Sequence, residues 1–118
     1  MKQLKPYKQL QDARGMFLGI VNTGLWKELN YIETEAGQTR GGHYHRETEE
    51  LFFILEGEIE IKITSLDGLI KHVFTARKGH IFIVEPLEIH SFKCLTPSKW
   101  INVLSKKMDD KALDFYRI

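Results

Sequence analysis

The sequence predicts an all-β protein folded as an antiparallel sandwich or barrel, and three observations support this fold class. Residues 58–64 alternate strictly between isoleucine and charged or polar side chains, which is the period of a strand with one buried face. Short apolar runs recur along the chain and end at turn residues such as glycine, proline, asparagine or aspartate. No long segment repeats at the helical period of about 3.6 residues.

Each predicted strand is a short run that a turn signal closes. The runs are residues 16–21, 26–34, 50–55, 58–64, 70–76, 80–84, 89–95 and 100–104. Turns are expected at residues 22–24, 35–37, 56–57 and 65–69, with further breaks at Gly79, Pro86 and Pro97. Residues 109–116 are expected to form a short helix, because Asp109 and Asp110 would interact favourably with its N-terminal end.

Length and composition indicate one soluble domain, residues 1–118. Lys and Arg number 17 and Asp and Glu 16, a net charge of +1, so we expect no nucleic-acid partner. The longest purely apolar run, Leu51–Leu55, is far shorter than the roughly 20 residues of a membrane helix, so no membrane contact is expected. The first residues lack the apolar stretch of a signal peptide, and the single Cys94 gives no sign of an oxidising compartment. We therefore expect a cytoplasmic protein.

The run Leu51–Leu55 also predicts a covered outer face. Both faces of this strand are apolar, which is typical of a strand that is covered on both sides. In a small barrel one face points inward, and the other must be hidden by a second sheet, a tail or another subunit. A homodimer is the simplest of these arrangements, so we expect one.

Four side chains form the candidate chemical site. His43 and His45 lie two residues apart, so on a strand they point to the same side. Glu50 has the parity of the inward residues that follow it, and His90 begins another strand. Three imidazoles and one carboxylate suit one divalent transition metal per chain, such as Zn, Fe, Mn, Co, Ni or Cu. We interpret the remaining histidines, His72 and His80, as ordinary polar residues.

The spacing of these residues resembles a known superfamily. The segment Gly37-x5-His43-Tyr44-His45-x4-Glu50-x6-Gly57 resembles the first motif of the cupins, and Gly79-x10-His90 resembles the second. The motifs occupy residues 37–57 and 79–94. The resemblance implies a double-stranded β-helix (jelly-roll) barrel, often dimeric, with His43, His45, Glu50 and His90 as metal ligands.

Three positions depart from the second cupin motif. Glu85 stands where the motif usually has proline, Leu87 where it usually has glycine, and Cys94 where it often has asparagine. We therefore expect a reshaped turn near Leu87 and a small buried cysteine. None of these departures removes one of the expected ligands.

A second, local resemblance points to different chemistry. The hexapeptide Arg40-Gly41-Gly42-His43-Tyr44-His45 is similar to a strand of cupin-type nucleotide-sugar epimerases and ketoisomerases. That resemblance implies a metal-free site in which His43, as general base, removes a proton next to a sugar ketone. Arg40 would then bind a diphosphate oxygen. The alternative for Arg40 is a charge at the barrel rim paired with Glu33 or Glu35.

Several functions therefore remain open. The first is a metal-dependent enzyme, of oxygenase or isomerase type, in which the ion polarises a small-molecule substrate. The second is the metal-free nucleotide-sugar isomerase or epimerase, and the third is a non-catalytic small-molecule-binding module. A fourth is a closed structural zinc site. We interpret most of the aromatic residues, which include Phe52, Phe82, Phe92 and Trp100, as core packing rather than pocket lining.

Overall fold

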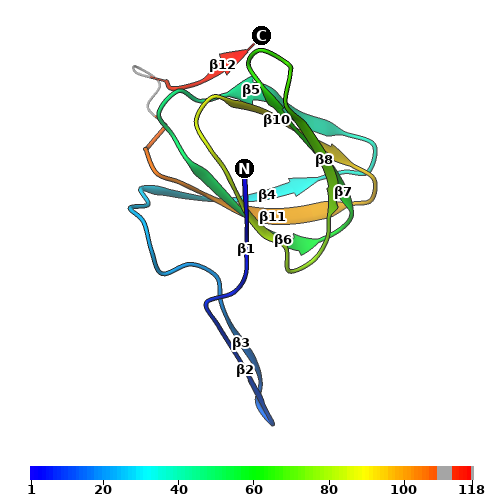
Figure 1. Ribbon diagram of the computed structural model, residues 1–118. Coiled ribbons are helices and arrows are strands. Elements are labelled where there is room, and N and C mark those ends of the chain that lie inside the picture. Colours follow the sequence, from blue (N-terminus) through cyan, green and yellow to red (C-terminus); the bar gives the residue numbers. More distant parts are fainter. Residues whose placement is uncertain (109–112, 118) are drawn as a thin grey trace.

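The computed structural model describes residues 1–108 and 113–117, and every regular element among them is a β-strand (Figure 1). The strands are β1 (Lys2–Leu4), β2 (Lys8–Asp12), β3 (Gly15–Gly19), β4 (Glu28–Thr34), β5 (Thr39–Tyr44), β6 (Glu50–Glu56), β7 (Ile59–Ser65), β8 (Lys71–Ala76), β9 (Ile81–Val84), β10 (Glu88–Cys94), β11 (Ser98–Leu104) and β12 (Tyr116–Arg117). The described part of the chain contains no helix with the length and hydropathy needed to cross a bilayer.

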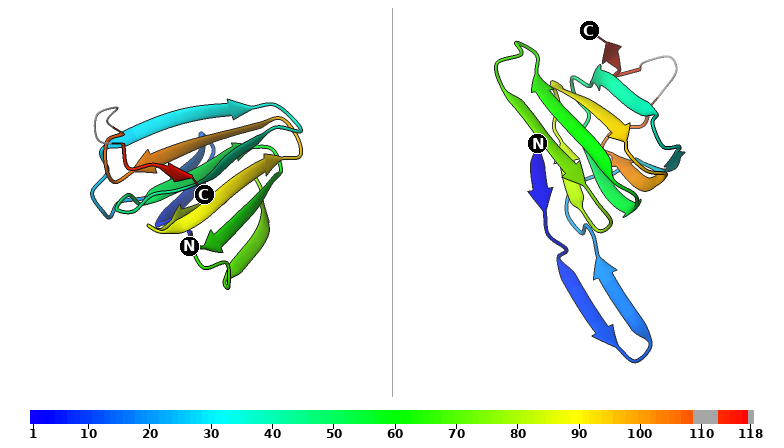
Figure 2. Two further views of the ribbon diagram at one scale, coloured as in Figure 1. Left: turned by 90° about the horizontal axis from the view of Figure 1, so that it is seen from above. Right: turned by 90° about the vertical axis from the view of Figure 1, so that its right-hand side faces the viewer.

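Two antiparallel sheets of five strands pack face to face and enclose the interior (Figures 1 and 2). Their strand orders are β1-β9-β6-β11-β4 and β12-β5-β10-β7-β8. Every pairing joins antiparallel strands. The prediction of an all-β jelly-roll barrel is thus confirmed.

Most strands of the barrel agree with the predicted runs. Strands β1, β2, β5 and β12 lie outside those runs; each pairs with a neighbour, β1 with β9, β2 with β3, and β5 with β10 and β12. Of the predicted helix at 109–116, residues 109–112 lie outside the described part. The rest of that segment is not helical, because its last residue, Tyr116, belongs to β12.

The barrel interior is filled by the inward faces of both sheets. Ile59, Ile61 and Ile63 of β7 are all buried, as their alternation predicts. The four aromatic residues named above are all buried in the core, where Phe82, for example, stacks on Phe52 with ring centroids 5.2 Å apart. Phe52, Phe92 and Trp100 also line a cavity beside the histidines, so core packing without pocket lining is confirmed only for Phe82.

The sheet that contains β6 has an apolar outer face as well. Leu51 and Ile81 are buried on this side, whereas Leu29 and Tyr31 at the edge strand β4 are 68% and 57% exposed. The two-sided apolar character expected of β6 is thus real. Among the described residues, this face is left uncovered at β4.

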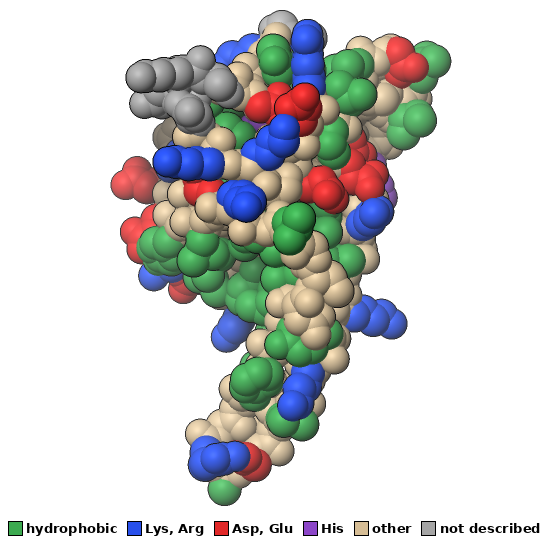
Figure 3. Space-filling model, turned by 90° about the vertical axis from the view of Figure 1, so that its left-hand side faces the viewer, with side chains coloured by type: hydrophobic (Ala, Val, Ile, Leu, Met, Phe, Trp, Pro, Cys, Tyr) green, Lys and Arg blue, Asp and Glu red, His purple; other side chains and the backbone are tan. Residues whose placement is uncertain are grey.

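Strands β2 and β3 form a hairpin, here called the arm, that projects from the barrel (Figures 1 and 2). The predicted strand at 16–21 therefore exists, but in the arm rather than in the barrel wall. All five residues of β2 are exposed, and so are Met16 and Phe17. In the space-filling view, hydrophobic side chains gather at the foot of the arm and continue along it (Figure 3).

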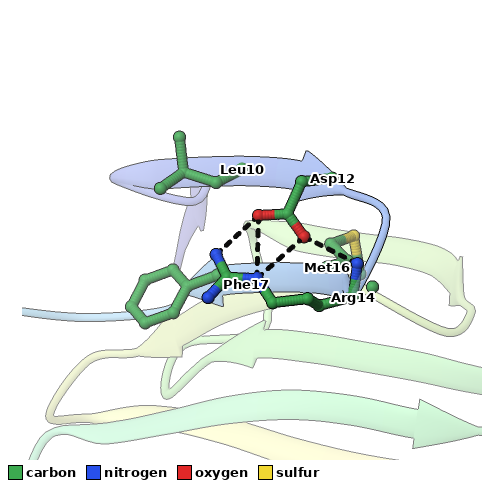
Figure 4. A pocket seen from close by; sticks show the side chains of 6 residues that line it. Leu10, Asp12, Arg14, Met16 and Phe17 are labelled. Atoms are coloured by element: carbon green, nitrogen blue, oxygen red, sulfur yellow. Dashed lines mark hydrogen bonds and ion pairs between the residues drawn. The ribbon is translucent and has the colours of Figure 1, made fainter.

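The end of the arm carries an ion pair between Arg14 and Asp12, with Nη2 and Oδ2 2.6 Å apart (Figure 4). Leu10, Met16 and Phe17 lie beside it around a shallow hollow of about 350 Å³. Both charged groups of the hollow are thus already paired with each other. The candidate chemistry lies inside the barrel instead.

Candidate functional site

A β-bulge places Arg40 and His43 on the same face of β5. Strand β10 pairs Phe92 with Arg40 and His90 with His43, and the register shifts between these two pairs. The extra residue is Gly42. In a regular strand, residues three apart point to opposite faces, so the bulge is what turns both side chains inward.

The neighbouring Gly41 must be a glycine for two reasons. Its φ of +104° is a conformation that side chains rarely adopt. A Cβ at this position would also lie 2.4 Å from the carbonyl oxygen of His90. The backbones of β5 and β10 therefore approach each other closely at Gly41.

The structure brings together all four predicted site residues. One candidate ligand atom from each of His43, His45, Glu50 and His90 lies within 4.8 Å of the other three. The Oε1 atom of Glu50 lies 2.6 Å from Nε2 of His45 and 3.3 Å from Nε2 of His90. His45, Glu50 and His90 are buried, and His43 is half-buried.

Backbone carbonyls fix the orientation of two of the imidazoles. His45 donates its Nδ1–H to the carbonyl oxygen of Asp114, and His90 donates its Nδ1–H to that of Glu88 at 3.3 Å. A carbonyl can only accept, so Nδ1 carries a proton in both rings. The other ring nitrogen, Nε2, is the atom that faces Glu50. This arrangement is typical of histidines that bind a metal through Nε2.

Glu50 has a further partner that the sequence did not reveal. Asn102 on β11 donates its Nδ2–H to Oε2 of Glu50 at 2.9 Å. Asn102 is a polar residue on the inward face of β11, between Trp100 and Leu104, which are both buried. Its parity was the only signal that could have identified it.

The pKa values of the buried groups divide the cluster into a charged pair and a neutral base. Burial opposes charge on Glu50, but hydrogen bonds from His45 and His90 hold its pKa well below the ordinary value. Burial would also lower the pKa of His45, but its hydrogen bonds to Glu50 and Asp114 raise it overall. Glu50 and His45 therefore form an ion pair.

His43 is the neutral member of the cluster. Burial, and then the charge of His90, lower its pKa to about 4, so its imidazole is uncharged at neutral pH. Its Nδ1 is buried and has no hydrogen-bond partner among the described residues. The ring of Phe115 stacks on it with centroids 4.2 Å apart. The imidazole can therefore accept a proton.

Two cavities meet at His43. The inner cavity, about 110 Å³, is also lined by Arg40, Trp100 and Asn102. The outer cavity, about 380 Å³, lies on the side of the C-terminal segment and is lined by Phe115. A small molecule in either cavity would contact the imidazole.

Arg40 carries a charge that no acidic group neutralises among the described residues. Its Nε donates to Oγ1 of Thr34 at 2.7 Å, and its Nη2 donates to the backbone carbonyl of Glu33 at 3.1 Å. The expected ion pair with Glu33 or Glu35 is therefore wrong, because Glu33 contributes only its carbonyl. The guanidinium keeps its positive charge at the inner cavity.

The remaining site expectations concern residues outside the cluster. His80 accepts a hydrogen bond from the backbone N–H of Arg77 at a turn, and His72 is exposed, so both are ordinary polar residues. Cys94 is buried in the core. Leu87, in the turn that was expected to be reshaped, has a φ of 69°, the left-handed conformation that glycine favours.

Comparison with known proteins identifies the family of the chain. The model of the polysaccharide biosynthesis C-terminal domain matches residues 10–107 of the 118. The chain belongs to this family. A curated relative, UDP-2-acetamido-2,6-beta-L-arabino-hexul-4-ose reductase from Pseudomonas aeruginosa, is 31% identical over 55 residues, which are 47% of this chain and 15% of the relative.

Solved structures share the fold. The capsular polysaccharide assembling protein CapF from Staphylococcus aureus is 19% identical over 100% of this chain, with a TM-score of 0.74, but the match covers only 33% of CapF. QdtA, a sugar 3,4-ketoisomerase from Thermoanaerobacterium thermosaccharolyticum solved in complex with TDP, is 18% identical. That match covers 97% of this chain and 85% of QdtA, with a TM-score of 0.78. At these identities the similarity establishes the fold.

Proposed function

We propose that this member of the polysaccharide biosynthesis C-terminal domain family acts on a keto sugar linked to a nucleoside diphosphate, as a ketoisomerase or epimerase. The observation that carries the proposal is the pairing of a neutral, half-buried base with an unneutralised cation on one face of β5. His43 is the base, and Arg40 is the cation. The TDP bound to the structurally similar ketoisomerase supports this class of substrate.

The chemistry follows from the acidity of a carbon next to a ketone. His43 takes the proton from that carbon, and the electrons of the C–H bond move into the carbonyl group to form an enediolate. When the former carbonyl carbon gains a proton and the hydroxyl proton of the enediolate moves to the other oxygen, the ketone shifts by one carbon. When a second acid returns a proton to the opposite face of the original carbon, the configuration of that carbon inverts. Arg40 binds a diphosphate oxygen. The negative charge of the bound substrate would raise the pKa of His43 toward the working pH.

A divalent transition metal held by His43, His45, Glu50 and His90 is the second candidate. The donor set fits, because three imidazole nitrogens and one carboxylate are ligands that zinc and its neighbours accept. The backbone carbonyls that orient His45 and His90 also support it. The metal would act as a Lewis acid on a substrate oxygen. His43 then could not serve as a free base through the same nitrogen.

Solvent exchange tests the first candidate. The protein is incubated in D2O with TDP-linked and UDP-linked 4-keto sugars, and deuterium in the sugar is measured by mass spectrometry. We expect incorporation at one carbon well above the rate without protein. Saturable binding without exchange would instead favour a non-catalytic binding module.

Metal analysis of protein purified without a histidine tag tests the second candidate. One equivalent of metal per chain, lost in Glu50→Ala, would support it, and loss of exchange after chelation would make the metal part of the reaction. If chelation sharply lowers stability but leaves exchange intact, the metal is structural. Absence of metal after incubation with Fe, Mn, Ni and Zn would leave only the metal-free reaction.

We also propose that the chain forms a homodimer in which a second copy covers the arm and the edge of the outer face. An isolated two-stranded hairpin is at best marginally stable in water. The arm nevertheless exposes Leu10, Met16 and Phe17, and the outer face exposes Leu29 and Tyr31. Sedimentation equilibrium should give the dimer mass, and Phe17→Asp should shift the protein toward monomer. A monomeric wild-type protein would contradict the proposal.

A further inference from the structure

The C-terminal strand β12 brings new side chains to the site. It pairs with β5 so that Arg117 lies opposite His43 and Tyr116 lies opposite Tyr44. Opposed residues in an antiparallel pair share a face of the sheet. Arg117 therefore lies on the side of His43, while Tyr116 stacks on Tyr44 on the other side, with ring centroids 5.5 Å apart.

The position of Arg117 is fixed by two contacts. Its Nη1 donates to the carbonyl oxygen of Gly41 at 3.1 Å, and its guanidinium lies over the ring of Phe115 at 5.2 Å. Phe115 in turn stacks on His43. A guanidinium has five N–H donors, so most of the Arg117 donors remain for another acceptor.

The charge of Arg117 is also not neutralised by the described residues, among which no carboxylate lies within 4.0 Å of it. Two carboxylates near the site, those of Glu50 and Asp114, already have hydrogen-bond partners. Glu50 accepts hydrogen bonds from His45 and Asn102. Asp114 accepts hydrogen bonds from the backbone N–H groups of residues 46–48 and from the hydroxyl of Thr48.

Two arginines thus flank His43 on one face of β5. The bulge directs Arg40 to this face. Strand β12 adds Arg117, which is hydrogen-bonded to the carbonyl oxygen of Gly41, the residue directly after Arg40. Planar guanidinium groups bind phosphate oxygens through paired hydrogen bonds, and two adjacent phosphates offer acceptors to two such groups.

We propose that Arg117 is a second diphosphate-binding residue of the site and that β12 completes the nucleotide-binding wall. This inference rests on the proposed function, because it assigns the part of a nucleotide-sugar substrate that the C-terminal strand would hold. Arg40 and Arg117 bind the diphosphate, while the sugar extends past His43.

The chain contains a matched control for this inference. Arg46 lies over the ring of Tyr116 at 4.3 Å, so it also stacks on an aromatic residue of β12. It belongs to the opposite face, with Tyr44, and therefore does not face His43. Loss of Arg46 removes an equal charge and a similar stacking contact without touching the proposed subsite.

Calorimetric titration with UDP and TDP tests the proposal. We expect Arg117→Met to weaken binding of the diphosphate by about tenfold or more, the range for a charge-assisted hydrogen bond. Arg46→Met should leave the dissociation constant within about twofold. Arg117→Lys, which keeps the charge but loses the planar donors, should lie between wild type and Arg117→Met. Thermal unfolding of each variant shows whether the fold is intact.

Two results would overturn the inference, and they can be told apart. If wild type binds a diphosphate and Arg117→Met binds it equally well, Arg117 has no role and the proposed function survives. If wild type binds neither diphosphate, the proposed function fails and the inference fails with it. Equal weakening by Arg117→Met and Arg46→Met would show a general charge effect and would also overturn it.

Discussion

The barrel interior has an apolar half and a polar half, although the same strands build both. Strand β6 begins inward with Glu50 and continues inward with Phe52 and Ile54, while β10 changes from His90 to Phe92. On each of these strands the polar residue of the site and the first apolar residue of the interior are therefore only two positions apart. Function can change at one end of such a strand while the other end keeps the fold.

The two halves differ in their energetics. Burial of apolar side chains such as Phe82 and Ile61 stabilises the fold by roughly 1.5–3 kcal/mol each. The buried ion pair of Glu50 and His45 is different, because the cost of desolvating two charges offsets much of their attraction. Substitutions in the polar half should therefore lower activity and leave stability nearly unchanged, whereas substitutions in the apolar half should mainly lower stability.

The largest effect is expected in the polar half. His43→Asn should slow deuterium exchange by about 10²–10⁴-fold, because it removes the general base, with little change in the unfolding temperature. Exchange kinetics and thermal unfolding are measured on the same samples. His72→Asn, an exposed histidine on β8, is the control and should leave exchange unchanged. Exchange at the wild-type rate in His43→Asn would exclude this histidine as the base.

The apolar half should show the reverse signature. Phe82→Ala should lower the free energy of unfolding by about 3–5 kcal/mol, because it leaves a cavity among packed rings. Urea denaturation measures this value. Leu69→Ala, at a side chain that is 85% exposed, should change it by less than about 0.5 kcal/mol. Similar losses in both variants would mean that the interior is not packed as described.

The bulge of β5 joins the two halves, so a substitution there should affect both stability and activity. Gly41→Ala combines an unfavourable φ with a close contact to His90, and we expect a loss of about 2 kcal/mol or more together with weaker diphosphate binding. Gly68→Ala is the matched control. Its φ is also positive, at +76°, but no atom lies within 4 Å of the added Cβ. Backbone strain alone should lower the free energy of unfolding of Gly68→Ala by about 1 kcal/mol and leave diphosphate binding unchanged. Denaturation measures the change in stability, and calorimetry measures the change in binding.

The smallest effect is a pH dependence of the ion pair. The folded pKa of His45 is raised above its ordinary value of 6.5. The contribution of the pair to stability is therefore fully present below about pH 6.5 and is lost as the pH rises through the folded pKa. In chelator-treated protein, the stability difference between wild type and Glu50→Gln should narrow as the pH rises from 6.5 through the folded pKa of His45. For the exposed Glu60→Gln no such trend is expected, and a difference between wild type and Glu50→Gln that is independent of pH would contradict the ion pair.

Local patterns predicted most of the barrel. The alternation of Ile59, Ile61 and Ile63 gave the face of β7 as well as the strand, because a period of two residues is a property of the strand itself. The arm shows the limit of this reasoning. Residues 16–21 have the composition of a core strand, yet Phe17 is exposed, because composition predicts a strand and not its neighbours.

The candidate site likewise contains residues that the sequence predicted and residues that it did not. The spacing of His43, His45, Glu50 and His90, which resembles the cupin motifs, named the residues of the cluster. Asp114, Phe115 and Arg117 carry no such signal. They reach the site only because a segment about 70 residues later in the chain pairs with β5.

The sequence by itself therefore determined the barrel class, which depends on periods within single strands. It also named the four side chains of the cluster, through their spacing and its resemblance to the cupin motifs. The tertiary structure decided which face of each strand is covered, the one-residue bulge that aligns Arg40 with His43, and the closing of the site by β12. These features depend on pairings between distant segments. Such pairings are set by the packing of the whole chain rather than by any local pattern.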